Sequence, residues 1–526
     1  MNTVEGGIAD APLKKKISFF SAMFVVIGSS IGAGIFLKSK AVLDGSHGSL
    51  VLAIFTWLIA GFAVIAMALS LIEIASARND NLSLIGWCKT FNSRFMYKAS
   101  KNFMFYIYLP LTYFFMPLYF ILQLQDGIGV WTHTTIGEDG LASLAPFSFG
   151  TSVDWLIWLL IVFAVMFYFV IVSGYSSRAG NIQNMGITLV KFIPLLVAAL
   201  IGFVYISMNG NVGGAITPGF KPDSSNTNSL SAMTPGFGMF IAMAGIFFAY
   251  DGFYVTSGLQ TEMEKPEKTP MAILFGLSIV TVIYLVIAIS MSMNGSGDFY
   301  GFGNWLVESG QGWLFGVINI LIAIGILGII NGFAMWAPRF VEDLIKEGEL
   351  PFSSKFKNNL NPNRPKVGIL YSIVIATPIV LIFTLMGVFG YIPGGYEGAG
   401  YGSGMESLYN FADLMANWAA IFTFGFIVMS IYGCLRNRKT KLIKTDEKKY
   451  FKPMAIFSIV VMSIALFITS FAPIFDLMAI FYLKDLSSDE IISRVMLVVV
   501  LILFILLTFL PTVIEDYISK KKTHHR

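Results

Sequence analysis

Charged residues are scarce in this sequence of 526 residues. Lys, Arg, Asp and Glu together make up 13% of the chain, whereas a soluble globular protein carries about 25%. Hydrophobic residues make up 56%, and the mean hydropathy is +0.73. This composition excludes an ordinary soluble domain and predicts a polytopic protein that lies in a lipid bilayer.

Cysteine and histidine are scarce as well. The two cysteines, Cys88 and Cys434, suggest neither a disulfide framework nor a metal site. None of the four histidines lies in an apolar run, and no metal-ligand spacing occurs. A membrane enzyme is therefore the weakest functional alternative. We expect no enzyme activity, no metal, no cofactor and no nucleic-acid partner.

Long apolar runs divide the chain. Each run has roughly 20 residues, the length that crosses a bilayer, and there is room for no soluble domain between them. The sequence therefore predicts an all-α polytopic membrane protein with twelve transmembrane helices. The expected spans are residues 17–37, 50–75, 101–124, 155–174, 185–207, 235–258, 271–293, 313–338, 367–389, 406–433, 453–475 and 494–513.

Basic residues fall unevenly on the connecting segments. If the N-terminus is inside, the inner segments hold 29 Lys and Arg, the outer segments hold five, and one lysine lies within a span. An excess of this kind marks the cytoplasmic side, so we expect both termini in the cytoplasm and the protein in the plasma membrane. The five outer residues are Lys38, Lys40, Lys221, Lys484 and Arg494.

The stretch Gly28–Phe36 (GSSIGAGIF) interrupts the first span. Glycine costs about 1 kcal/mol more than alanine in a helix interior, so a regular helix is unfavourable here. A break at membrane depth leaves backbone groups unpaired, which is tolerated only where protein, ligand or water satisfies them. We predict half of a substrate site at this first break. Close helix packing through Gly28, Gly32 and Gly34 is the alternative.

A second break is predicted at Tyr250–Phe253 in the sixth span, where Asp251 precedes Gly252. Interruptions at matching positions of two halves indicate a transporter site built from inverted repeats. Half-helix N-termini suit a carboxylate and free carbonyls suit a cation, so the pair of breaks indicates a zwitterionic substrate. Asp251 is a functional candidate because charges within a span are rare, although a structural ion pair is the alternative.

Lys191 is the other unusual charge. It lies about 10 Å inside the predicted fifth span, at a rise of 1.5 Å per residue, and Pro194 frees a carbonyl nearby. One interpretation is a lysine that reaches back to the interface. The other is a buried amine that exchanges a proton or replaces a bound sodium ion.

Three motifs resemble those of the amino acid–polyamine–organocation permeases. Gly28–Phe36 is similar to the first-helix signature Gly-x-x-Ile-Gly-x-Gly-Ile-Phe. Residues 247–270 resemble the sixth-helix pattern that ends in Glu-x-x-x-Pro-x-x-x-Pro, and residues 331–351 resemble the end of the eighth helix. The likeness covers roughly residues 15–440, so the sequence is identified as a member of this superfamily.

The resemblance implies a LeuT-like core of ten helices in two inverted five-helix repeats, with discontinuous first and sixth helices. Helices eleven and twelve would be peripheral. The implied organisation is a cytoplasmic tail (1–16), a transport core (17–433, with repeats 17–207 and 235–433), a basic cytoplasmic loop (434–452), peripheral helices (453–513) and a second tail (514–526).

The same resemblance implies roles for particular residues. The first break would hold the substrate carboxylate and the second its amino group. Phe248 falls at an aromatic gate, Lys191 matches a lysine that proton-coupled members use in place of sodium, and Glu73 resembles a residue beside the cytoplasmic gate. The implied substrate-binding residues are Ile27, Gly28, Ser29, Ser30, Ile31, Gly32, Ala33, Gly34, Phe248, Ala249, Tyr250, Asp251 and Gly252.

The sequence thus predicts a secondary active amino acid transporter that works by alternating access and is coupled to protons rather than sodium. An exchanger on the same fold, or a non-concentrating sensor or channel, is the alternative. A major-facilitator transporter is disfavoured because residues 76–100 lack its Gly-x-x-x-Asp-Arg loop. An Asp251 side chain that points into the site would favour a cationic substrate. Asp413, in the tenth span, has no partner that the sequence identifies.

Overall fold

The computed structural model consists almost entirely of helices. It describes residues 18–32, 34–77, 82–136, 142–209, 229–254, 263–294, 296–361, 363–391, 399–483 and 486–524. Within these ranges, ten helices are long and apolar enough to cross a membrane, and two shorter apolar helices lie in the first and sixth predicted spans. The all-helical class is confirmed, whereas the count of twelve spans and the inverted repeats stay predictions.

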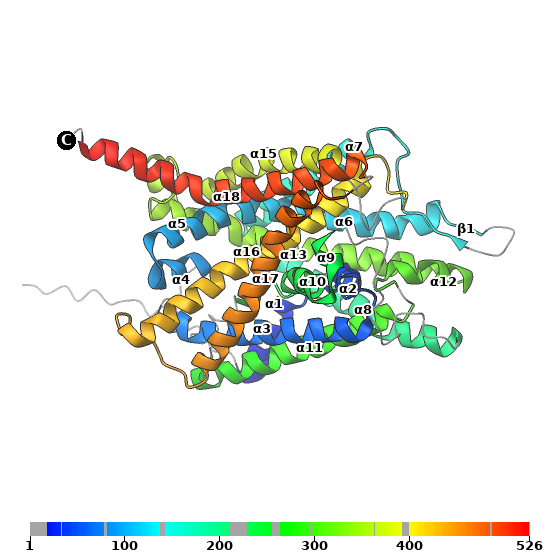
Figure 1. Ribbon diagram of the computed structural model, residues 1–526, viewed down its shortest axis with the longest axis horizontal. Coiled ribbons are helices and arrows are strands. Elements are labelled where there is room, and N and C mark those ends of the chain that lie inside the picture. Colours follow the sequence, from blue (N-terminus) through cyan, green and yellow to red (C-terminus); the bar gives the residue numbers. More distant parts are fainter. Residues whose placement is uncertain are drawn as a thin grey trace, which may run out of the picture.

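Most helices run along one long axis of the molecule (Figure 1). Strands β1 and β2, of two residues each, form the one sheet in the described part of the chain. The elements are α1 (Phe19–Ser30), α2 (Gly34–Gly45), α3 (Leu50–Ala77), α4 (Leu84–Phe91), α5 (Arg94–Phe103), the π-helix η1 (Met104–Tyr108), α6 (Leu109–Thr132), β1 (Thr135–Ile136), β2 (Ala142–Ser143), α7 (Asp154–Tyr175), α8 (Ser177–Asn209), α9 (Leu230–Met233), α10 (Pro235–Ala249), η4 (Pro266–Lys268), α11 (Thr269–Ser292), η5 (Tyr300–Phe302), α12 (Gly303–Glu308), α13 (Gly312–Lys346), α14 (Ser353–Phe356), η6 (Lys357–Asn359), α15 (Lys366–Gly390), α16 (Met405–Thr440), α17 (Phe451–Ala479) and α18 (Ser488–His524).

The third predicted span, α5–η1–α6, lies at the centre of the bundle. Its apolar window is 89% buried, compared with 28% for α15 and for α18. α6 packs against α13, α15 and α16, while α10 packs against α2, α3 and α16. Peripheral helices expose apolar side chains such as Leu160, Leu196 and Phe467. Lipid tails can cover these faces because the backbone groups of a helix are satisfied internally.

Both predicted breaks are present. α1 ends at Ser30 and α2 begins at Gly34, with extended backbone at Ile31 (ψ 110°). α10 ends at Ala249, and the chain then turns through Gly252, which has a φ of +99°. Glycine reaches this φ without steric cost. Residues 255–262, which include the predicted end of the sixth span at residue 258, lie outside the described residues.

Three helices extend beyond the predicted spans, because a run of apolar residues marks the apolar part of a helix and not the residues where the helix begins and ends. α8 begins at Ser177 rather than at residue 185, so Lys191 lies 14 residues, about 21 Å, from the helix start. The first span continues as α2, and Lys38 is completely buried in it rather than lying in an outer segment. α16 also extends to Thr440, into the predicted basic loop.

Candidate functional site

The two breaks touch each other at Gly34. A Cβ atom on Gly34 would lie 2.6 Å from the Cα of Ala249, so glycine lets the first turn of α2 reach the end of α10. At Gly28, in contrast, a Cβ would meet no described atom within 4 Å, and at Gly32 it would lie 3.3 Å from Ile329. Close packing therefore explains Gly34 but not Gly28.

Tyr284 of α11 connects the ends of α1 and α10. Its hydroxyl lies 2.8 Å from the carbonyl oxygen of Ser30 and 2.9 Å from that of Ala249. Trp57 of α3 packs edge-on against the same ring, with centroids 5.8 Å apart. The single hydroxyl proton can therefore be donated to either of two carbonyl oxygens, one at each of the helix ends. Sequence reasoning missed Tyr284, because a tyrosine in an apolar span carries no distinguishing signal.

Lys191 of α8 faces the first break. Its Nζ atom donates hydrogen bonds to the carbonyl oxygens of Gly28, at 3.0 Å, and Ile31, at 3.2 Å. The ammonium therefore satisfies two carbonyls that the interrupted helix leaves unpaired. The lysine points at the break rather than at a helix end, so reaching back to the interface does not describe it.

Asp251 of the second break points toward the third span. The Tyr108 hydroxyl donates to its Oδ2 atom at 2.6 Å, and the Gly252 amide donates to Oδ1 at 2.9 Å. Tyr108 closes the π-helix η1 and packs edge-on against Phe333 of α13. π-helical turns are rare and are frequently found at functional sites. Within the described residues, no lysine or arginine forms an ion pair with Asp251.

A buried ion pair lies one turn into α2, close to the first break. Lys38 Nζ is 2.5 Å from Asp413 Oδ1 and 2.8 Å from the Tyr119 hydroxyl, which itself donates to Asp413 at 2.9 Å. Asn417 donates to the second oxygen of the carboxylate at 3.2 Å. The ammonium also lies 4.8 Å from the centre of the Phe248 ring, a cation–π distance. This cluster gives Asp413 its partner and surrounds the predicted aromatic gate.

A second ion pair lies near the C-terminal end of α16, the helix that also carries Asp413. Glu73 of α3, fully buried, accepts hydrogen bonds from Arg438 at 2.9 and 2.6 Å. Its Oε2 also accepts the Lys448 amide at 2.8 Å. A planar guanidinium fits a carboxylate with two parallel bonds, so Glu73 fastens both α16 and the following loop to α3.

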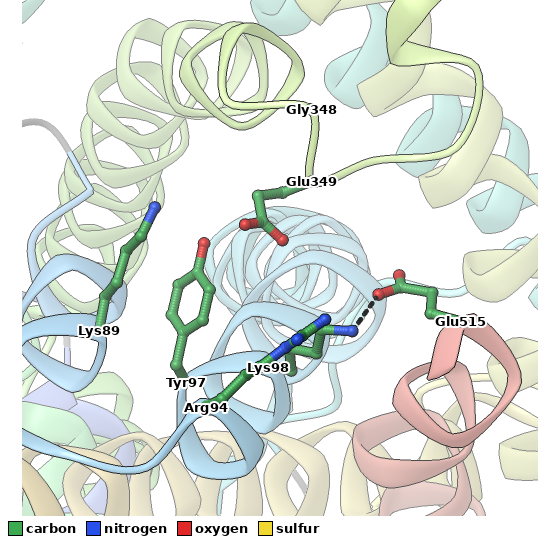
Figure 2. Close-up of a pocket in the computed structure, with 7 residues that line it drawn as sticks. All are labelled: Lys89, Arg94, Tyr97, Lys98, Gly348, Glu349 and Glu515. Atoms are coloured by element: carbon green, nitrogen blue, oxygen red, sulfur yellow. Dashed lines mark ion pairs between the residues drawn. The ribbon is translucent and has the colours of Figure 1, made fainter. Parts of the chain in front are cut away.

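A polar pocket of about 510 Å³ opens between α4, α5, the end of α13 and α18. Figure 2 shows Lys98 directed at Glu515, with Tyr97 and Glu349 across the opening; the Lys98–Glu515 pair measures 3.1 Å. Lys89 on α4 pairs with Glu347 at 2.5 Å. None of the residues that line this pocket belongs to the predicted substrate site, so the pocket is separate from the breaks.

Most of the predicted site residues lie at the two breaks, whereas Glu73 lies apart from them in its pair with Arg438. Ala33 lies outside the described residues, and the side chain of Ser29 is not described. Phe248 contacts the aromatic rings of Phe115 and Tyr119. Four residues at these sites were not predicted: Lys38, Tyr108, Tyr119 and Tyr284. Lys38 alone carried a usable signal, because it is a charge only four residues beyond Gly34.

Two interrupted helices that meet inside a bundle define a class of membrane transporters. The sequence pattern of the amino acid permease family matches residues 17–480, and this chain belongs to that family. It is 46% identical over 548 residues to an uncharacterized protein of Mycoplasma pneumoniae, covering 97% of this chain and 95% of the relative.

Characterized transporters are more distant. The chain is 27% identical to the serine/threonine exchanger SteT of Bacillus subtilis, over 71% of this chain and 78% of the relative. It is 22% identical to the human cystine/glutamate transporter, over 64% and 62%. The crystal structure of MhsT in complex with L-phenylalanine matches with a TM-score of 0.51 and 13% identity, over 87% of this chain and 99% of that one. This last likeness shows the LeuT-like fold alone. The predicted superfamily is confirmed, and the protein is an amino acid transporter.

Proposed function

We propose that the two breaks together bind the backbone of an amino acid, which is carried across the plasma membrane by alternating access. The contact between Gly34 and Ala249 carries this proposal. The first amides of α2 have no helical acceptor, and the first turn holds no acidic residue. This helix end suits a carboxylate, while the carbonyl end of α10 suits an ammonium group.

The transport is sodium-independent and driven by protons. Carbonyl oxygens are the ligands that hard cations prefer in proteins. The ammonium of Lys191 already lies against two of them, at Gly28 and Ile31. It therefore replaces a sodium ion and supplies a group that exchanges a proton. Exchange of one amino acid for another is the second candidate, because the relatives include a serine/threonine exchanger.

The preferred substrate has a cationic side chain. Asp251 accepts hydrogen bonds only from a phenol and an amide among the contacts described, and it has no cationic partner in that part of the chain. A carboxylate within a span is costly unless a cation or a proton neutralises it. A substrate with a second amine or a guanidinium supplies that charge at the second break.

Alternating access depends in this proposal on two ion pairs, each of which has one member on α16. Opening of the outer path separates Lys38 from Asp413, and opening of the inner path separates Glu73 from Arg438. α1, α2, α3, α10 and α11 move together in this scheme, against α6, α13, α15 and α16. Both termini are on the cytoplasmic side, where the Glu73 pair lies.

The test is uptake of labelled amino acids into proteoliposomes. We expect uptake of lysine or arginine that rises with an inward proton gradient and does not require sodium. Lys191→Ala should abolish the proton stimulation, and Asp251→Asn should raise the KM for lysine about tenfold. Uptake that requires internal amino acid and ignores the gradient would establish exchange instead. Absence of competition by any amino acid would refute the substrate class.

A further inference from the structure

The segment between α16 and α17 carries an excess of positive charge. Residues 436–452 contain eight Lys and Arg but only two acidic residues. Three of the cations, Arg438, Lys441 and Lys448, form ion pairs. The other five are exposed and have no anionic partner within the described residues. We call these five the polybasic face: Arg436, Lys439, Lys444, Lys449 and Lys452.

An apolar side chain stands among these cations. Leu442 is 84% exposed, at the point where α16 ends and the backbone of Lys441 takes a φ of +53°. A leucine this exposed to water is unfavourable, because burying its side chain gains about three times the transfer free energy of one methylene group. An exposed leucine next to unpaired cations matches the interface of a bilayer, where acyl chains and headgroups meet.

Lipid-facing surface leads directly into the polybasic face on both helices. On α16, exposed Tyr432 lies one turn before Arg436, and on α17, exposed Ile456 lies one turn after Lys452. One helical turn is about 5.4 Å, so the cations lie just beyond the apolar face that contacts acyl chains. This is the level of the lipid headgroups. In Figure 1 the start of α17 lies at the same end of the molecule as α4 and α5.

The loop that carries these cations is held in a defined position. The Asn437 side chain accepts the Ile443 amide at 2.9 Å and donates to its carbonyl at 2.8 Å. The Asp446 amide donates to Ser76 of α3 at 2.8 Å, and the Lys448 amide donates to Glu73. The loop that carries the polybasic face is therefore fastened to α3 at Ser76 and Glu73, and the second of these contacts reaches the ion pair between α3 and α16 directly.

We propose that the polybasic face docks onto anionic phospholipid headgroups of the cytoplasmic leaflet, with Leu442 inserted among them, and that docking stabilises the closed Glu73–Arg438 contact. Clusters of four to eight Lys and Arg next to a span bind anionic lipid in this way. The coupling to transport rests on the proposed function, whereas the docking does not. Lipid charge thus regulates how often the inner path opens.

Docking can be measured without any transport assay. Both native cysteines are buried, so Leu442→Cys in the full chain can be labelled selectively with a polarity-sensitive fluorophore. In nanodiscs, replacing part of the phosphatidylcholine with phosphatidylglycerol should shift the emission to the blue. The shift should disappear when Lys439, Lys444 and Lys449 are all changed to Gln. No shift with phosphatidylglycerol, or a shift that survives the triple change, would overturn the docking.

Regulation is tested by uptake into vesicles with and without phosphatidylglycerol. In the wild type, we expect the uptake rates with and without phosphatidylglycerol to differ about fivefold, given the energy of each cation near an anionic surface. In the triple variant, the two rates should be nearly equal. The matched control is Lys355→Gln, Lys357→Gln and Lys366→Gln, three exposed lysines outside the loop, which should keep the wild-type ratio.

Leu442→Ser provides a second variant at an exposed position, where folding is not at risk. It should reduce the lipid dependence without removing any charge. Equal loss of lipid dependence in the triple variant and the control would show a general charge effect and refute the coupling. If the wild type transports no amino acid, the proposed function is wrong. The emission shift still tests whether the polybasic face docks onto anionic lipid.

Discussion

Two ion pairs tie neighbouring helices to α16 at opposite ends, with their charges reversed. Lys38 of α2 meets Asp413 at one end, and Glu73 of α3 meets Arg438 at the other. In each pair the partner outside α16 is fully buried, and the member on α16 is about one-fifth exposed, at 21% and 22%. The 25 residues between Asp413 and Arg438 span about 37 Å of helix, which exceeds the bilayer core of about 30 Å.

The two pairs differ in the kind of cation that each one contains, whereas both carboxylates accept further hydrogen bonds. Lys38 is a single ammonium that lies beside Tyr119 and the ring of Phe248. Glu73 receives both a forked guanidinium and the Lys448 amide. A guanidinium fork imposes orientation as well as charge, whereas an ammonium acts as a point charge. In the proposed scheme of alternating access, we therefore expect the Glu73–Arg438 pair to resist opening more strongly than the Lys38–Asp413 pair.

The largest effect is expected from Glu73→Gln. It removes a buried charge and leaves Arg438 without its counter-ion, so the free energy of unfolding should fall by about 3 kcal/mol. Amino acid uptake should be lost. Arg438→Lys keeps the charge and should show a smaller loss. Equilibrium unfolding in mixed micelles measures the stability of both variants. If Glu73→Gln is as stable as the wild type, the Glu73–Arg438 pair does not stabilise the fold as expected.

Lys38→Met should come next, with a loss of about 2 kcal/mol, because Asp413 keeps the hydrogen bonds from Tyr119 and Asn417. The double variant Lys38→Met/Asp413→Leu should regain most of that stability, since replacing both members of a buried pair by apolar residues is often neutral. The corresponding change at Glu73 and Arg438 should recover less, because the Lys448 backbone amide loses its acceptor and cannot rotate away. The Tyr119 hydroxyl and the Asn417 amide that lose Asp413 belong to side chains, which can reorient. Equal recovery of stability in the two double variants would contradict the expected difference between the two ion pairs.

Tyr119→Phe is expected to cost about 1 kcal/mol, the value of one hydrogen-bonded hydroxyl. The hydroxyl lies between Lys38 and Asp413, but the ion pair is direct and survives its removal. The KM for the substrate should stay unchanged. Thermal unfolding and uptake kinetics check these two expectations, and a loss as large as that of Lys38→Met would show that the phenol is essential to the outer pair.

The smallest effect is expected from Lys441→Ala, which removes an exposed pair with Glu447. The hydrogen bond from Lys441 lowers the pKa of Glu447, so the pair is charged at neutral pH and is lost only as the pH falls through that lowered pKa. Exposed pairs contribute little. Unfolding and uptake at pH 7 should match the wild type, and a clear change in either would mean that this pair helps hold the loop on Glu73.

The length of the apolar runs and the glycines within two of them were sufficient to predict the helical class and both breaks. The contact of Lys191 with the first break was anticipated only as an alternative. Lys38 was assigned to an outer segment because a lysine normally ends an apolar run. It lies inside α2 because Asp413, 375 positions later in the chain, neutralises it. Such a partner cannot be identified from one sequence.

The sequence by itself determined that this chain is a bundle of membrane helices with two weak points, since the cost of glycine in a helix and the length of an apolar run are local properties. It also determined the family, through motifs near those weak points. Only the tertiary structure decided which charges meet. The pairing of Lys38 with Asp413 and of Glu73 with Arg438, and the bridge from Tyr284 to both breaks, depend on helices that are distant in the chain. A charge within a bilayer is stable only where packing brings its partner within hydrogen-bonding distance.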